Sequence, residues 1–167
     1  MEARGKSLAF APAEIEDILS MTYGDKRLFA LLSLIFPFVD LRNQFHIDHI
    51  FPISRFTTSR LKKAGVAEHE IEKLGQLANE LPNLQLLEGP ANMEKRAAMP
   101  APWLDARYVV ARDREHYRSI HLLGEIPSDI QGCEAFWEAR RERLRAKITS
   151  VLNRSADSST VEAMVTA

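Results

Sequence analysis

The chain contains very little cysteine: Cys133 is the only one among its 167 residues. A single cysteine can neither close an internal disulfide nor supply the cysteine pairs of a structural zinc site. The sequence therefore argues against a disulfide-rich secreted scaffold and against a zinc finger. It favours a reduced, intracellular setting, and we expect a cytoplasmic protein.

Long apolar runs are also missing. The most apolar stretch, LFALLSLIFPFV at 28–39, is too short to cross a bilayer and is interrupted by Pro37. The first ten residues, MEARGKSLAF, lack the long apolar segment of a secretory signal. We therefore expect a buried helix at 28–39 and no membrane partner.

The chain has no excess of charge of either sign, since 22 Lys and Arg residues stand against 23 Asp and Glu residues. A net charge of −1 gives no global attraction for nucleic acid, although a local basic face can still bind it. The hydrophobic fraction of 46% is that of an ordinary globular domain, and the length suits one domain with a real core.

Helix signals mark the N-terminal part of the chain. Pro12 and the acidic residues behind it predict a first helix that Gly24 ends, and Asp25 can cap a second helix that Pro37 stops. Residues 1–44 are therefore expected to form a helical hairpin that belongs to the same domain as the rest.

Helix signals return in residues 105–152, which we expect to pack on the core. The stretch CEAFWEARRERLRAKITSVL places Trp137 and Leu144 on one apolar stripe. Its arginines alternate with glutamates and are expected to form an ordinary salt-bridged surface: Arg140, Arg141, Arg143 and Arg145. The segment 153–167, rich in Ser, Ala and Thr, is expected to be a disordered tail.

Short strands are predicted in the middle of the chain. Residues 45–51 and 83–87 read as two strands, a helical insert at 55–80 separates them, and 91–99 reads as a short helix. The expected fold class is α+β: a mostly helical chain with a small ββα unit embedded at 45–104.

Residue types suited to phosphodiester hydrolysis lie along this ββα unit. Asp48-His49 lies in the first strand, Asn83 begins the second, and Asn92 and Lys95 share a face of the short helix. Histidine suits a general base near neutral pH, whereas carboxylate and amide oxygens suit a hard cation such as Mg²⁺. These residues predict metal-assisted hydrolysis of a phosphodiester if the fold brings them together.

The stretches DHIFP and NLQLLEGPANMEKRAAMP resemble HNH endonucleases, whose fold is the ββα-metal or His-Me finger. They are similar in particular to the C-terminal HNH domain of GmrSD-type modification-dependent restriction and anti-phage defence proteins. The similarity covers about residues 12–150 and is most specific over 45–104. It implies a DNA endonuclease that needs Mg²⁺ or Mn²⁺, holds no structural zinc, and leaves a 5′-phosphate and a 3′-hydroxyl.

The resemblance also implies a role for each matching residue. His49 would be the general base, Asp48 and Asn92 would hold the metal, and Asn83 would hold the loop that carries His49. Lys95 would contact the phosphate or steady the metal-site helix. Because strand alternation sends Asp48 and His49 to opposite faces, the backbone must leave regular strand geometry near them.

Further cations are candidates for contact with the phosphates of DNA. They are Arg96 beside Lys95 and, in an insert stretch without acids, Arg55, Arg60, Lys62 and Lys63. His46 is a candidate for supporting the site residues indirectly, through a hydrogen bond to one of them. No P-loop pattern occurs, so the resemblance implies a partner: a nucleotide-hydrolysing sensor domain or subunit outside this chain.

Two alternatives remain open. The chain could be a DNA-binding or partner-docking module whose metal site is degenerate, or a nuclease that acts on RNA. A lone Asp-His pair is also compatible with a hydrogen-bonded strand end. The order Asp48-His49, Asn83, Asn92 and Lys95 favours a nuclease over such a strand end.

Overall fold

The computed structural model describes residues 11–165 and the side chains of 11–154. It is mostly helical, with one small antiparallel sheet of two strands, so the expected α+β class is confirmed. The first ten residues of the predicted hairpin region and the last two of the tail lie outside the described residues.

The N-terminal hairpin consists of α1 (Pro12–Leu19) and α2 (Leu28–Ile35). Both helices are shorter than the sequence predicted. The chain leaves helical geometry after α1 because the main chain of the turn pairs with a distant segment: Thr22 forms a β-bridge with Glu80, and Tyr23 N–H donates to the Asn79 carbonyl over 2.9 Å. A tertiary contact here overrides local helix propensity.

The predicted strands are confirmed as β1 (Phe45–His49) and β2 (Leu84–Glu88), which pair in antiparallel register. The register places Asp48 opposite Gln85 and His49 opposite Leu84. Regular pairing stops at His49, where the chain bends. The departure from strand geometry expected near Asp48 and His49 therefore occurs directly after them.

The insert and the later helices surround this sheet. The insert contains two short helices and a 3-10 turn, and a further helix that the sequence did not predict follows α5. The bounds are η1 Ile53–Phe56, α3 Thr58–Lys63, α4 Glu68–Leu77, η2 Leu81–Asn83, α5 Gly89–Lys95, α6 Pro100–Arg107, α7 Ala111–Ile120, η3 Ile130–Gly132 and α8 Cys133–Val165.

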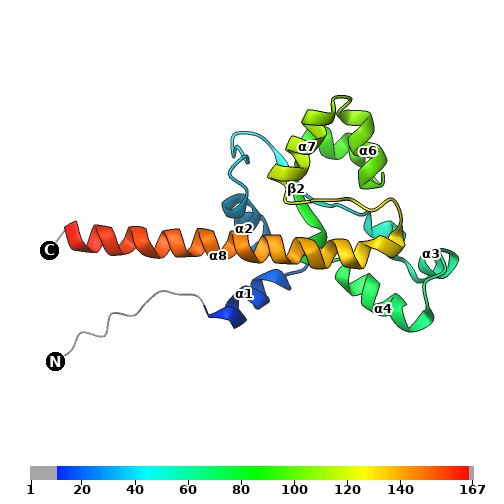
Figure 1. Ribbon diagram of the computed structural model, residues 1–167, viewed down its shortest axis with the longest axis horizontal. Coiled ribbons are helices and arrows are strands. Elements are labelled where there is room, and N and C mark those ends of the chain that lie inside the picture. Colours follow the sequence, from blue (N-terminus) through cyan, green and yellow to red (C-terminus); the bar gives the residue numbers. More distant parts are fainter. Residues whose placement is uncertain (1–10, 166–167) are drawn as a thin grey trace.

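The long helix α8 crosses the molecule, with α1 and α4 on one side and α2, β2, α6 and α7 on the other (Figure 1). Leu144 and Ile148 pack with α1, α2 and the sheet, whereas Phe136 and Trp137 pack in a second cluster with the insert, α6 and α7. One helix therefore contributes to both halves of the core.

One expectation about this helix is wrong. Arg140 is not part of a salt-bridged surface, since its side chain is fully buried. The helix also continues to Val165 through most of the tail that was expected to be disordered. Once the packed part of α8 is formed, each added residue gains a backbone hydrogen bond without a new nucleation step, and Ala, Glu and Met favour this extension.

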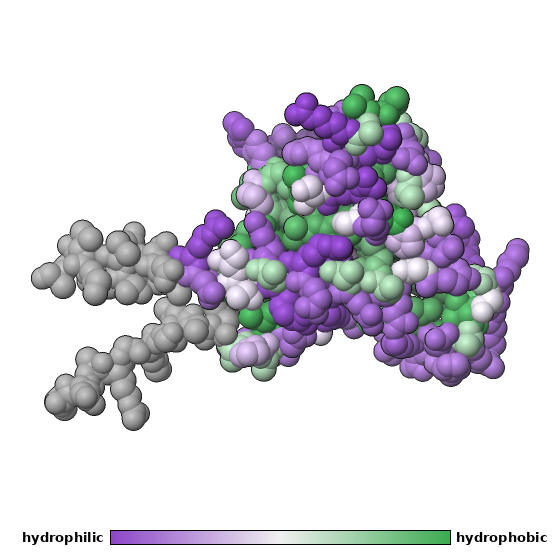
Figure 2. Space-filling model, in the orientation of Figure 1, coloured by the Kyte–Doolittle hydropathy of each residue, from purple (hydrophilic) through white to green (hydrophobic). Residues whose placement is uncertain are grey.

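The outer surface is mixed. Hydrophilic residues cover most of the face that Figure 2 shows, with smaller hydrophobic areas between them. No helix in the described part of the chain is long and apolar enough to span a membrane.

Candidate active site

The end of β1 and the helix α5 line one open pocket of about 370 Å³. Asp48 and His49 reach it from β1, and Asn92 and Arg96 reach it from α5. The remaining lining residues are Tyr23, Ile47, Pro52, Ile53, Ser54 and Ala97. Three residues with predicted roles in the reaction, Asp48, His49 and Asn92, thus share a pocket although they come from two separate parts of the sequence.

One oxygen of the Asp48 carboxylate is held from two sides. Gln85 Nε2 donates to Oδ2 over 2.9 Å, and Lys95 Nζ pairs with the same oxygen at 2.9 Å. Gln85 is itself fixed by the Tyr117 hydroxyl, which donates to its Oε1 over 2.9 Å. Oδ1 of Asp48 has no hydrogen-bond partner among the described residues, so one carboxylate oxygen is left for a ligand while the other sets the orientation of the group.

Lys95 does not have the position of a phosphate contact. Its side chain is fully buried, and Nζ also donates to the His49 carbonyl over 2.7 Å. Burial lowers the pKa of Lys95, and the nearby Asp48 raises it in part. The sequence-based assignment to phosphate binding is therefore corrected: Lys95 ties α5 to the end of β1, which agrees with the other role predicted for it.

The imidazole of His49 is held by two residues that the sequence did not single out. Its Nε2 lies 3.0 Å from Asn79 Oδ1, and the ring of Tyr23 lies 4.7 Å from it, centroid to centroid. The amide oxygen can only accept, so Nε2 must carry the proton in this contact. Nδ1 is then the nitrogen with a free lone pair, as a general base requires.

Nothing in the local sequence marks Asn79 or Tyr23 for this role. Asn79 follows the end of an ordinary amphipathic helix, α4, and Tyr23 lies in a turn of the N-terminal hairpin. Their own main chains are joined by the hydrogen bond from Tyr23 N–H to the Asn79 carbonyl. This pairing of distant segments creates the contact with His49, and a linear pattern cannot reveal it.

Asn83 braces the chain after His49 and does not touch the imidazole. Its Oδ1 accepts from Phe51 N–H over 2.9 Å and from Trp137 Nε1 over 3.0 Å. Its Nδ2 donates to the carbonyls of Phe51 (3.0 Å) and Ala78 (2.7 Å). All four hydrogen bonds of the buried amide are therefore used to join the chain after β1, the end of α4 and α8. These contacts are compatible with the loop-holding role predicted for Asn83, which stays a prediction.

Arg140 supports the same region from α8. Its guanidinium donates to main-chain carbonyls around Asn83, those of Pro82 and Leu84 at 2.8 Å each, and to the His121 carbonyl. Burial lowers the pKa of Arg140 to about 9, which still leaves it charged at neutral pH. The buried cation thus provides hydrogen-bond donors for main-chain carbonyls in η2 and at the start of β2.

Asn92 and Arg96 face the pocket from α5 in different ways. Asn92 is half-buried, and its side-chain amide has no hydrogen-bond partner within the described part of the chain. Arg96 is exposed and follows the last turn of α5 with φ +46°, a backbone conformation that costs energy for any residue other than glycine. Such strain is found more often at functional sites than elsewhere.

The structure does not bring every predicted residue to the pocket. His46 is exposed on β1 and contributes nothing to the lining. Among the insert cations, Lys62 pairs with Glu68 at 2.7 Å, whereas Arg55 and Lys63 line a separate pocket. None of these side chains contacts Asp48 or His49.

The residues present suit a hard divalent cation. No three side chains of His, Cys, Asp or Glu converge in the part of the chain that is described, so a closed protein cage is absent there. Mg²⁺ is commonly bound by one or two carboxylates together with water and substrate phosphate oxygens. The free oxygen of Asp48 and the unpartnered amide of Asn92 match that donor set. Cys133, by contrast, is buried, and burial raises the pKa of its thiol to about 12.

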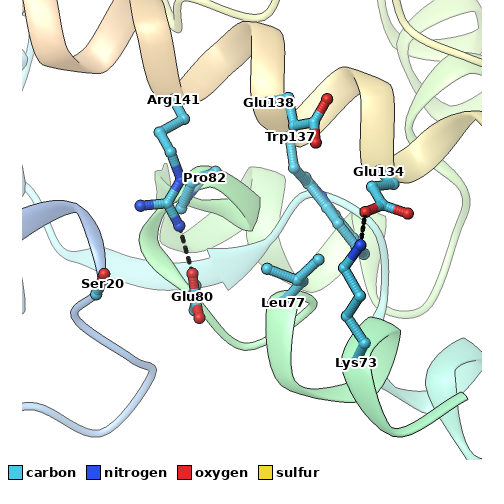
Figure 3. A pocket seen from close by; sticks show the side chains of 9 residues that line it. All are labelled: Ser20, Lys73, Leu77, Glu80, Pro82, Glu134, Trp137, Glu138 and Arg141. Atoms are coloured by element: carbon cyan, nitrogen blue, oxygen red, sulfur yellow. Dashed lines mark hydrogen bonds and ion pairs between the residues drawn. The ribbon is translucent and has the colours of Figure 1, made fainter. Parts of the chain in front are cut away.

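A second pocket, of about 380 Å³, lies between α4 and α8 (Figure 3). Its cations each meet an acid: Lys73 pairs with Glu134, and Arg141 pairs with Glu80. The indole of Trp137, whose nitrogen donates to Asn83, forms part of the wall. These pairs link α4 and the segment that follows it to α8, and they leave the pocket without unbalanced positive charge.

The comparison with protein families agrees with the resemblance seen in the motifs. The family described as "GmrSD restriction endonucleases, C-terminal domain" matches residues 25–147, which include every residue of the pocket except Tyr23. No curated protein matches the chain.

Proposed function

The chain belongs to the family of C-terminal domains of GmrSD restriction endonucleases, and from this premise we propose that it is a divalent-metal-dependent HNH endonuclease that hydrolyses DNA. The observation that carries the proposal is the shared pocket of Asp48, His49 and Asn92, in which a candidate base and two oxygen donors face the same open space.

His49 is the residue that moves a proton. With Nε2–H donated to Asn79, the lone pair of Nδ1 accepts a proton from a water molecule. The water oxygen attacks the phosphorus, and the bond from phosphorus to the 3′-oxygen breaks. The products are a 5′-phosphate and a 3′-hydroxyl once the leaving oxygen takes up a proton from solvent.

Asp48 and Asn92 would hold Mg²⁺ or Mn²⁺, which supplies positive charge that offsets the charge developing on the phosphate and the leaving oxygen. Lys95 and Gln85 keep the Asp48 carboxylate in one orientation, so its free oxygen is set before a substrate arrives. Asn83 holds the main chain at Phe51 and thereby limits movement of His49. Arg96 is exposed and lines the pocket, and its guanidinium would meet a phosphate of the substrate.

In this proposal the chain is the effector part of a cytoplasmic restriction or phage-defence system. A nucleotide-hydrolysing sensor domain or subunit, with DNA, would be its partner. The single carboxylate in the pocket suits one metal ion and one scissile strand, which supports nicking as the elementary event.

A plasmid assay tests the proposal. Supercoiled DNA is incubated with wild type, His49→Ala and Asn92→Ala in Mg²⁺ and, separately, in Mn²⁺. We expect wild type to convert the plasmid to the open-circular or linear form, and His49→Ala to lose about 10²-fold or more of that rate because the base is absent. Asn92→Ala should be partly restored by a higher metal concentration.

Equal cleavage by all three proteins would remove the catalytic assignment. DNA binding by wild type without cleavage in either metal would favour the docking-module alternative, and cleavage confined to RNA substrates would replace DNA as the substrate.

A further inference from the structure

A pocket of about 540 Å³ lies between the insert and the segment before α8. Its lining consists of Arg55 from η1, Arg60 and Lys63 from α3, Ala64 and Ile130. The three charged side chains are all exposed, and no described acid contributes to the lining.

The charges in this pocket are not balanced within the described part of the chain. No ion pair or side-chain hydrogen bond joins Arg55, Arg60 or Lys63 to another described residue, so three like charges converge on one hollow. Like charges at short range repel each other, and an anion in the hollow removes that cost. Lys62, next in sequence to Lys63, differs because Glu68 neutralises it at 2.7 Å. The pocket of Figure 3 differs in the same way, since acids pair with its cations.

The 3-10 turn η1 connects this pocket to the candidate active site. Ile53 and Ser54 line the active-site pocket, and the next residue, Arg55, lines the basic pocket. A DNA strand carries one phosphate per 3.4 Å of helix axis, so a strand held at His49 has further phosphates within reach of η1. Guanidinium groups suit such phosphates because their planar N–H donors can bind two oxygens at once.

We propose that Arg55, Arg60 and Lys63 form a binding site for a backbone phosphate of duplex DNA, beside the scissile position. This rests on the proposed nuclease function and adds to it a second anchoring point. The site would set the path of the strand across η1 without reading its bases, because phosphate contacts carry no sequence information directly.

The adjacent lysines provide a matched test. Binding of a fluorescent 20-base-pair duplex is measured by anisotropy in EDTA, which prevents cleavage, at several salt concentrations. Lys63→Ala and Arg55→Ala should each weaken binding, with a salt slope shallower by about 0.9 for each phosphate that the variant no longer neutralises. Lys62→Ala removes the same charge from the same helix, outside the pocket, and should change the affinity by less than about twofold. Circular dichroism confirms that each variant is folded.

Equal losses of affinity in Lys62→Ala and Lys63→Ala would overturn the proposal, because the effect would then belong to net charge and not to the pocket. Unchanged slopes in the pocket variants would also overturn it, as would tighter binding of an RNA of the same sequence with the same dependence on Lys63. Binding is measured in EDTA, where no cleavage occurs, so a wild type without nuclease activity would not affect this result. If wild type cleaves DNA but the pocket variants keep the wild-type salt slope, only the phosphate-site proposal is wrong.

Discussion

The amide of Asn83 offers the sharpest test of how this site is held together. Replacing Asn83 with Ala removes four hydrogen bonds at a position with no exposure to solvent. Two donors, Phe51 N–H and Trp137 Nε1–H, lose their acceptor inside the protein. A buried donor without a partner costs about 1–3 kcal/mol, so we expect the free energy of unfolding to fall by about 4 kcal/mol. The two carbonyls add less, because unpaired carbonyls are better tolerated.

Urea unfolding followed by tryptophan fluorescence measures this loss, since Trp137 itself contacts Asn83. Asn83→Asp is the informative companion variant. It keeps an acceptor for Phe51 N–H and for the indole but has no donor for the two carbonyls, and it places a carboxylate in a buried position. Both variants should be strongly destabilised, while Asn79→Ala, which affects a half-buried residue, should lose only about 1 kcal/mol.

Cleavage by folded Asn83→Ala, measured well below its unfolding temperature, should fall by about 10²-fold, as expected when a reacting group shifts by about 1 Å. A stability loss below about 1 kcal/mol would show that the four hydrogen bonds do not hold the loop. Wild-type cleavage by the folded variant would refute the link between Asn83 and the position of His49.

Three further predictions follow from single side chains. Asn79→Ala should lower the turnover rate more than tenfold with little change in KM, because it frees the imidazole of His49 without altering the phosphate contacts; an unchanged turnover rate would argue against this role. Burial beside Arg140 lowers the pKa of His121 to about 3 against about 6.5 in the unfolded chain. The unfolded chain therefore takes up the proton first, and the stability from this residue is complete above about pH 6.5 and declines as the pH falls. The loss at pH 5 should be about 2 kcal/mol, and urea unfolding of His121→Phe should show a correspondingly flatter pH profile. Burial raises the pKa of the Cys133 thiol to about 12, so alkylation at pH 8 should be slow in the folded protein and should accelerate on unfolding; rapid alkylation without urea would contradict the buried position.

The helix α8 has a larger part in the site than a packing role. Trp137 donates to Asn83, and one turn later Arg140 donates to the carbonyls on either side of it. Both residues are buried, so the hydrogen bonds are shielded from water. Through these hydrogen bonds, α8 supports the main chain around Asn83, and Asn83 in turn holds the chain that follows His49.

The N-terminal hairpin also reaches the site. Its turn carries Tyr23, whose ring lies against the imidazole of His49 and whose main chain pairs with Asn79. The sequence predicted the helices on both sides of this turn but no contact between the turn and the site. The contact depends on a β-bridge between Thr22 and Glu80, which no local sequence pattern predicts.

The linear sequence carried the information for the strands, the helix α5 and the main chemical groups. Period-two and helical patterns depend on neighbours in the chain, and the order of Asp48-His49, Asn83 and Asn92 can be read directly. The residues that orient these groups could not be read in this way. Three features depend on the packing of segments that are far apart in sequence: whether Lys95 points to solvent or to Asp48, whether Arg140 is exposed or buried, and whether Asn79 contacts His49. Residue type and spacing identified the candidate catalytic groups, whereas long-range register and burial determined which of them face the pocket and which hold the others in place.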